Sequence, residues 1–95
     1  MLVLVSLSDG PRHGYAIMAD VEAFSGLALG PGTLYAVLAR LEGAGLVEPL
    51  PAEERRRPYR ITAAGRAALA AQLSQIEEFL RVGRSRLPRT REGRA

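Results

Sequence analysis

Residues 29–50, LGPGTLYAVLARLEGAGLVEPL, contain a helix with clear start and stop signals. Pro31 suits the first helical position, where its fixed φ and missing N–H are tolerated, and Gly45 suits a left-handed cap at the end. Between them, apolar residues recur at three- and four-residue spacing: Leu34, Val37, Leu38 and Leu41. This spacing predicts an amphipathic helix over residues 31–44, with the apolar stripe directed into a core.

The outer face of this helix has almost no bulk, because its residues are Gly32, Ala36, Ala39 and Gly43. Small residues let a helix sink into the major groove of DNA, where Thr33 and Tyr35 can donate to phosphates and Arg40 can reach a phosphate or a guanine edge. The alternative is that the alanines are ordinary helix formers on a solvated face, although such a face normally carries more charge. We therefore expect the following residues of this helix to face DNA: Thr33, Tyr35, Ala36, Ala39 and Arg40.

Two helices are expected before this one. The opening MLVLVSLS is apolar but only eight residues long, so it predicts a short buried helix and neither a signal peptide nor a membrane span. Asp9-Gly10-Pro11 then predicts a turn in which Pro11 starts the next helix. The second helix begins near His13, a lone histidine that we interpret as a helix-start or packing residue. The inward face of this helix is predicted to carry Ile17, Met18, Val21 and Phe24.

Two β-prone runs, residues 46–50 and 59–62, follow the central helix and can pair as a hairpin. The loop between them, residues 51–57, contains three consecutive arginines, which can bind DNA phosphates. Charge runs are also common in loops that are merely solvated, and Glu53 and Glu54 can pair with the same arginines. The candidate DNA-binding residues of the hairpin are Arg55, Arg56, Arg57 and Arg60.

A long final helix is expected over residues 63–83, with Thr62 as its N-cap. Its apolar residues step by four, three and four positions, and are Leu69, Leu73, Ile76 and Leu80. This stripe is long for so small a domain and favours contact with the same helix of a second copy, whereas packing on its own domain is the alternative. Residues 84–95 carry five arginines and almost nothing to bury, so we expect a flexible tail.

The composition excludes several functions. The 95 residues suffice for one domain, and the absence of cysteine excludes disulfides, thiolate metal sites and redox chemistry while suiting a reducing cytoplasm. All thirteen basic residues are arginine and the net charge is +3, which favours an anionic partner, unless GC-rich codons explain the missing lysine. The run at residues 30–33 lacks the lysine of a phosphate-binding loop, and the single histidine has no nucleophile and orienting group around it. We expect neither an enzyme, a metal nor a cofactor.

Three blocks of the sequence resemble the PadR-like family of transcriptional regulators: HGYAI at residues 13–17, PGTLYAVLARLEGAGLV at residues 31–47 and RRRPYRITAAGRAAL at residues 55–69. The resemblance implies a homodimeric winged-helix DNA binder, usually a repressor, with its C-terminal helix in the dimer interface. It also implies a small hydrophobic or phenolic effector. Two positions depart from the family pattern, since Gly30 replaces the usual serine cap and Ala36 stands where proline commonly follows the tyrosine.

The element order predicts a fold that is mainly α with a small β-hairpin, namely a winged helix-turn-helix followed by a long C-terminal dimerisation helix. We divide the chain into a DNA-binding domain at residues 1–62, the dimerisation helix at 63–83 and the arginine-rich tail at 84–95. The expected function is recognition of an inverted repeat in double-stranded DNA by a cytoplasmic homodimer without membrane contact. A winged-helix protein-interaction or dimerisation module without specific DNA binding is the alternative.

Overall fold

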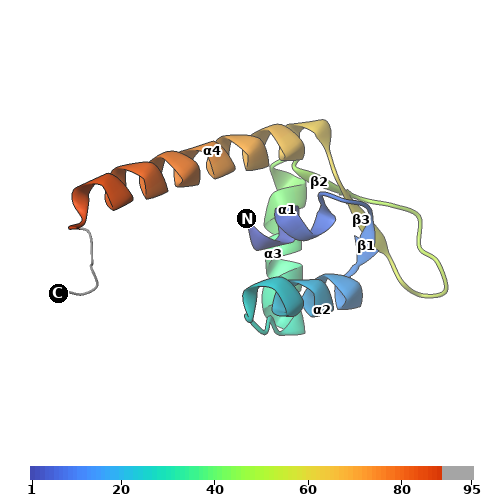
Figure 1. Ribbon diagram of the computed structural model, residues 1–95. Coiled ribbons are helices and arrows are strands. Elements are labelled where there is room, and N and C mark those ends of the chain that lie inside the picture. The colour runs from blue at the N-terminus through green and yellow to red at the C-terminus, as the bar shows by residue number, and fades with distance from the viewer. Residues whose placement is uncertain (89–95) are drawn as a thin grey trace.

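The computed structural model describes residues 1–88. Its elements follow in the order α1 (Leu2–Leu7), β1 (Arg12–His13), α2 (Gly14–Ser25), α3 (Pro31–Gly43), β2 (Val47–Pro49), β3 (Pro58–Ile61) and α4 (Ala63–Arg86). Helices α1, α2 and α3 gather beside the small sheet, and α4 leaves this body as one long helix (Figure 1). The mainly helical fold with a β-hairpin is therefore confirmed.

The turn after α1 differs from the prediction. Pro11 does not start a helix, because Arg12 and His13 form the short strand β1, which pairs antiparallel with β3. Helix α2 begins at Gly14, with His13 as its N-cap: the ring Nδ1 accepts from the backbone N–H of Ala16 at 3.3 Å. The expectation that His13 starts a helix is confirmed. A two-residue strand has no periodicity of its own, so its pairing depends on where β3 lies.

The sheet has the strand order β1-β3-β2, and β3 pairs antiparallel with both neighbours. The predicted hairpin is present, with Val47 opposite Ile61 and Glu48 opposite Arg60. The Nε of Arg60 donates to the Glu48 carboxylate at 2.9 Å. Opposite charges that face each other across a strand pair stabilise its register.

The core lies between the three short helices and the inner face of the sheet. Leu34 and Leu38 of α3 are buried, whereas Val37 and Leu41 at the edge of the same stripe are half-buried. Gly45 has φ +76°, and the N–H groups of Gly45 and Leu46 donate to the carbonyls of Glu42 and Leu41, as in a glycine-terminated helix end. The buried members of the core are Val3, Leu4, Leu7, Ile17, Val21, Leu34, Leu38, Val47, Ile61 and Leu69.

Phe24 is an exception to the predicted inward face of α2. Ile17 and Val21 are fully buried and Met18 is half-buried, but Phe24 is 46% exposed. The last turn of α2 extends beyond the elements that cover its first two turns, and residues 22–28 are all exposed. Helical spacing therefore placed Phe24 on the correct side of α2 but did not reveal that nearly half of its surface stays exposed.

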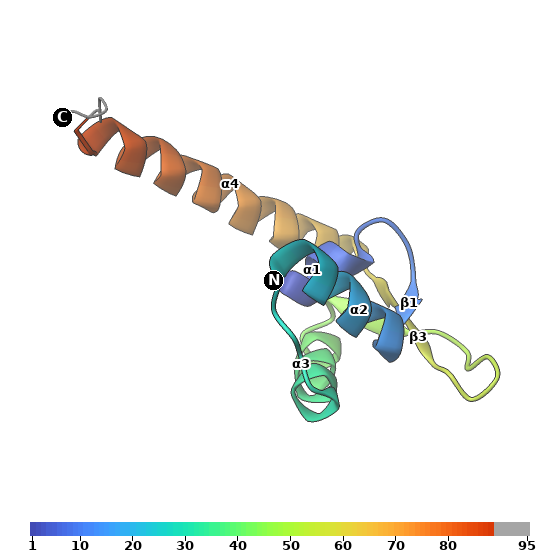
Figure 2. The same cartoon turned by 60° about the horizontal axis from the view of Figure 1, so that its bottom comes forward.

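Helix α4 is capped as predicted, since the Thr62 hydroxyl accepts from the Gly65 N–H at 3.0 Å and donates to the Gly45 carbonyl at 2.7 Å. Its first turns pack on the core through Leu69, and the rest projects away from α1 to α3 in both views (Figures 1 and 2). The helix continues to Arg86, three residues past the expected end, so the flexible tail does not begin at residue 84. The remainder of that predicted tail, residues 89–95, lies outside the described residues.

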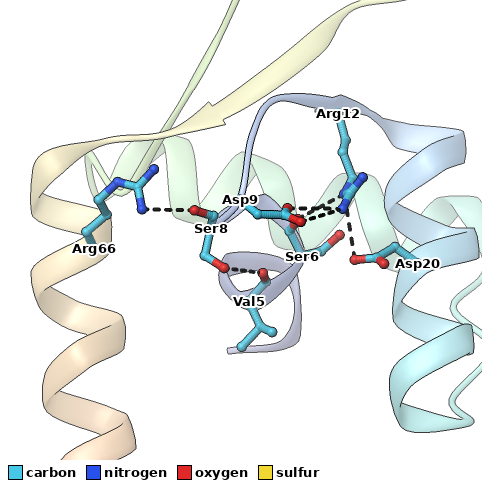
Figure 3. A network of polar contacts seen from close by, with 7 residues as sticks. All are labelled: Val5, Ser6, Ser8, Asp9, Arg12, Asp20 and Arg66. Atoms are coloured by element: carbon cyan, nitrogen blue, oxygen red, sulfur yellow. Dashed lines mark hydrogen bonds and ion pairs between the residues drawn. The ribbon is translucent and has the colours of Figure 1, made fainter.

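A polar network fixes these elements to one another (Figure 3). The guanidinium of Arg12 donates to the Ser6 carbonyl and to Asp9, each at 3.0 Å, and lies 3.6 Å from the Asp20 carboxylate of α2. From α4, Arg66 donates to the Ser8 carbonyl at the end of α1 at 2.9 Å. These two arginines therefore have structural partners and join α1, β1, α2 and α4.

Candidate nucleic-acid interface

The outer face of α3 is open to solvent. Helix geometry places Gly32, Ala36, Ala39 and Gly43 on one side of α3, with Thr33 and Arg40 beside them, and all are exposed. Gly30 is the N-cap and provides no side-chain hydrogen bond, so the first turn of α3 leaves its N–H groups free of side-chain capping. The surface is thus a narrow, nearly uncharged ridge with one arginine near its C-terminal end.

The hairpin loop ends in a tight turn. Glu53 and Arg56 exchange backbone hydrogen bonds of 2.6 and 2.8 Å, and the two residues between them, Glu54 and Arg55, have φ of +48° and +70°. Two left-handed residues in a row are the geometry of a type I′ turn, whose twist matches that of paired strands. The turn therefore holds Arg55 at the apex of the wing, which we define as residues 51–58.

The three wing arginines have different surroundings. Arg55 is exposed at the apex, the Nη1 of Arg56 lies 3.3 Å from the Nε2 of His13, and Arg57 donates to the Leu50 carbonyl at 3.1 Å. Within residues 1–88, no ion pair joins them to Glu53 or Glu54. Arg60 lies on the sheet and is paired with Glu48, so it is not part of the wing cluster.

A hollow of about 380 Å³ brings three elements together. It is lined by His13, Gly14 and Tyr15 at the start of α2, by Tyr35 of α3 and by Arg55, Arg56 and Arg57 of the wing. Tyr35 and the arginines were predicted from the sequence, whereas His13, Gly14 and Tyr15 were not predicted as parts of a site. The HGYAI block was the only signal for them, because no local rule places a helix start beside a hairpin loop 43 residues away.

Gly14 is the residue that lets Tyr35 reach this hollow. A Cβ at position 14 would lie 2.3 Å from the Tyr35 hydroxyl oxygen, closer than any van der Waals contact permits. The Tyr35 hydroxyl therefore lies directly against the first turn of α2, although Tyr35 as a whole is 50% exposed. Helix α3 thus has two separate surfaces of interest: its outer ridge of small residues, and the Tyr35 hydroxyl in the hollow.

A second surface lies on the projecting part of α4. Leu73, Ile76 and Leu80 are 43%, 38% and 48% exposed, as a partner contact would require, but Leu69 is only 6% exposed and belongs to the core of its own chain. The first turns of α4 thus pack Leu69 on its own domain, and its place in a dimer interface stays a prediction. Phe79, at 80% exposure, was missed.

A shallow hollow of about 540 Å³ follows the same part of α4 and is lined by Gln72, Gln75, Ile76, Glu78, Phe79 and Val82. Next to it, Arg81 donates to Glu78 at 3.1 Å and holds the pKa of that carboxyl below its ordinary value of 4.5. A lowered pKa means that this pair supports α4 above pH 4.5 and that its support is lost as the pH falls through the pKa of the folded state.

In the part of the chain that the structure describes, no three His, Cys, Asp or Glu side chains are grouped as metal ligands. Over residues 1–88, no helix combines the length and the apolar character needed to cross a bilayer.

Three helices with an exposed third helix, followed by an arginine-tipped hairpin, define the class of winged helix-turn-helix proteins. The chain belongs to the PadR-like family of transcriptional regulators, whose sequence model matches residues 3–71. It is accordingly a transcriptional regulator and not an enzyme.

Relatives support this assignment. The chain is 39% identical over 85 residues to the transcriptional regulator Rv3488 of Mycobacterium tuberculosis, with 83% of this chain and 76% of that protein covered. It is 58% identical over 69 residues to an uncharacterized 37.1 kDa protein in transposon TN4556 of Streptomyces fradiae, covering 73% of this chain but only 20% of that protein. The structure of a transcriptional regulator from Clostridium thermocellum is similar, with a TM-score of 0.79 at 27% identity, covering 92% of this chain and 90% of that chain.

Proposed function

We propose that this regulator is a sequence-specific DNA-binding repressor that acts as a homodimer on an inverted repeat. In this proposal, α3 enters the major groove and the wing lies on the backbone or in the minor groove. The observation that carries it is the exposed ridge of small residues on α3, a helix whose Tyr35 shares one hollow with the three wing arginines. Such a function places the protein in the cytoplasm, with the DNA that it regulates.

The ridge suits groove entry because it combines close approach with few polar contacts. Ala36 and Ala39 allow the helix to lie near the base edges, where an alanine methyl can also contact the methyl group of thymine. Arg40 can donate to the two acceptors of a guanine, and Thr33 can donate to a phosphate. In this arrangement α3 reads the sequence, and the wing supplies attraction that is independent of sequence.

The homodimer is supported by the apolar residues that α4 leaves uncovered. Leu73, Ile76 and Leu80 share one side of α4, and Phe79 lies next to them. Burying this stripe against the same stripe of a second copy would remove apolar surface from water and place two α3 helices on one duplex. A dimer of this kind requires an inverted repeat, because its two halves are related by twofold symmetry.

An effector of small hydrophobic or phenolic character is part of the same proposal. The hollow along α4 offers Ile76, Phe79 and Val82 as apolar contacts and Gln72 and Gln75 as hydrogen-bonding groups. It is formed by one helix and is too open to enclose a ligand by itself. A partner helix that covers it would create the enclosed apolar pocket that such ligands need.

The uncovered stripe of α4 also favours the second candidate function, a protein-interaction or dimerisation module without specific DNA binding. Selection of duplexes from a random library by the full chain separates the two. A sequence-specific repressor enriches an inverted repeat whose half-sites lie about one helical turn, roughly 10 base pairs, apart. An interaction module without specific DNA binding enriches no sequence, and its affinity for all duplexes in the library is the same.

A further inference from the structure

The contact between His13 and Arg56 cannot be a hydrogen bond while His13 also caps α2. His13 uses Nδ1 to accept the N–H of Ala16, and its Nε2 lies 3.3 Å from the Nη1 of Arg56. A neutral imidazole has one acceptor nitrogen and one N–H. Since Nδ1 is the acceptor, Nε2 carries the hydrogen, and two donors face each other.

Other states of the ring do not remove this conflict. If Nδ1 carried the hydrogen, Arg56 could donate to Nε2, but the N–H of Ala16 would lose its cap and α2 would be weakened. An imidazolium has two N–H groups, so it would lose the cap and still oppose Arg56. An acceptor next to both Nε2 and Nη1, either water or an anion, satisfies all the donors at once.

The charges around the pair show on which side this acceptor fits. One hollow beside His13 and Arg56 also contains Arg55, Arg57 and the two tyrosines and no acidic residue. A second hollow, on another side of the same pair, is lined by Glu53, Glu54 and Pro58. An anion is attracted to the first hollow and repelled from the second. In the first hollow it also meets the Tyr35 hydroxyl, which lies against Gly14.

We propose that His13 and Arg56 jointly bind one phosphodiester group of duplex DNA in this basic hollow and thereby fasten the wing to α2. The proposal rests on the DNA-binding function proposed above and adds His13 to its contacts. One oxyanion accepts from the Nε2–H of His13 and from the guanidinium of Arg56, so the wing and the start of α2 hold the same phosphate. Each contact is then worth less when the other is missing.

Two variants of His13 separate its two nitrogens. His13→Asn keeps a good N-cap acceptor near the position of Nδ1 but lacks the distal donor, whereas His13→Gln keeps a distal N–H and is the poorer cap. With a duplex selected by the wild-type chain, we expect His13→Asn to weaken binding by about 3- to 10-fold per subunit, the usual size of one hydrogen bond. The salt dependence should not change, because a neutral ring displaces no cation. His13→Gln should retain more affinity than His13→Asn despite its weaker cap.

A double-mutant cycle tests whether the two residues hold one phosphate. In an Arg56→Ala background, the loss caused by His13→Asn should be clearly smaller than in the wild-type background, because Arg56 no longer holds the shared phosphate against His13. Arg57→Ala is the matched control, since Arg57 is held by the Leu50 carbonyl, and in that background the loss should remain complete. Equal losses in both backgrounds, or no loss in either, would overturn the proposal.

Two further results separate this proposal from its alternatives. If Arg40→Ala weakens binding while His13→Asn does not, the DNA-binding function stands and the phosphate contact is wrong, whereas a wild-type chain that binds no duplex contradicts the function itself. The source of the anion is tested by NMR titration with inorganic phosphate alone. Signals of His13 and Arg56 should respond to the duplex and not to millimolar phosphate, and a saturable response to phosphate would assign the hollow to a free anion.

Discussion

At the scale of single residues, the two glycines of α4 at positions 65 and 83 have opposite roles. A Cβ on Gly65 would lie 2.1 Å from the Leu46 carbonyl oxygen and 2.7 Å from Ile61, whereas a Cβ on Gly83 would meet nothing within 4 Å. The close contact at Gly65 lets the first turn of α4 lie directly on the end of the hairpin. Gly83 makes no comparable close packing contact within its own chain.

Gly65→Ala should therefore lower the free energy of unfolding by about 2–3 kcal/mol, because the carbonyl of Leu46 is backbone and moves only with its strand. Gly83→Ala is the control and should leave stability unchanged or raise it by up to about 1 kcal/mol, as alanine is the better helix former. Urea unfolding followed by circular dichroism measures both. A Gly65→Ala protein as stable as the wild type would mean that α4 does not pack on the hairpin in this way.

Arg40 tests the role of the α3 ridge. Its side chain is exposed and has no hydrogen bond within the described chain, so Arg40→Ala should leave the circular dichroism spectrum intact. Specific DNA binding should weaken by about 1–3 kcal/mol if Arg40 contacts a base edge, and by less if it meets only a phosphate. Titration against the selected inverted repeat measures the change. An unchanged affinity would remove Arg40 from the interface.

At the scale of the element, the wing concentrates charge at a turn that has its own strain. Glu54 and Arg55 adopt positive φ without being glycine, at a cost of about 1–2 kcal/mol each. This turn holds Arg55 at the apex and leaves Arg56 facing His13. Glycine at position 55 would relax the backbone but would remove a cation, so Arg55 keeps its charge at the apex at the expense of local stability.

Replacing Arg55, Arg56 and Arg57 together by alanine should make DNA binding less dependent on salt. Each phosphate contact adds about 0.9 to the slope of log affinity against log salt, so we expect the slope to flatten by about one to three units per subunit. Selected and unselected duplexes should be weakened alike, since phosphate contacts carry little sequence information. Arg60→Ala is a useful comparison because Arg60 is paired with Glu48. If the triple variant keeps the wild-type slope, the wing is only a solvated loop.

At the scale of the whole molecule, the wing and the far end of α4 lie on opposite sides of the helical body (Figures 1 and 2). The chain is 58 Å long in its largest dimension and much narrower in the other two, because α4 projects beyond the core. This shape separates a charged surface from an apolar one. It permits the proposed dimer contact through α4 without covering the α3 ridge.

Leu73→Glu combined with Ile76→Glu should convert the dimer to a monomer, because two carboxylates would enter the apolar contact on each chain. Ala71→Glu combined with Ser74→Glu adds the same charge to the opposite, exposed side of α4 and should leave the dimer intact. Sedimentation at tens of micromolar protein measures both. A wild-type chain that is already monomeric at this concentration would contradict the proposed dimer, and so would equal dissociation of the two double variants.

Local features of the sequence were sufficient to predict most helix boundaries. Pro31, Gly45 and Thr62 are found in their predicted capping or end positions, because a cap forms between residues that are two to four positions apart. The inward stripe of α3 was predicted for the same reason, since neighbours on a helical face are three or four residues apart. These interactions do not depend on the rest of the chain.

The sequence by itself thus determined the helices, the hairpin and the residues on the exposed ridge of α3, and its three conspicuous blocks were enough to indicate the family. Only the tertiary structure decided that Arg12 and His13 form a strand, that Leu69 is covered by its own domain while Leu73 is not, and that His13 meets Arg56. The physical reason is the separation of the partners along the chain. His13 and Arg56 are 43 positions apart, so their contact depends on how the sheet and α2 pack together and has no signature in either local segment.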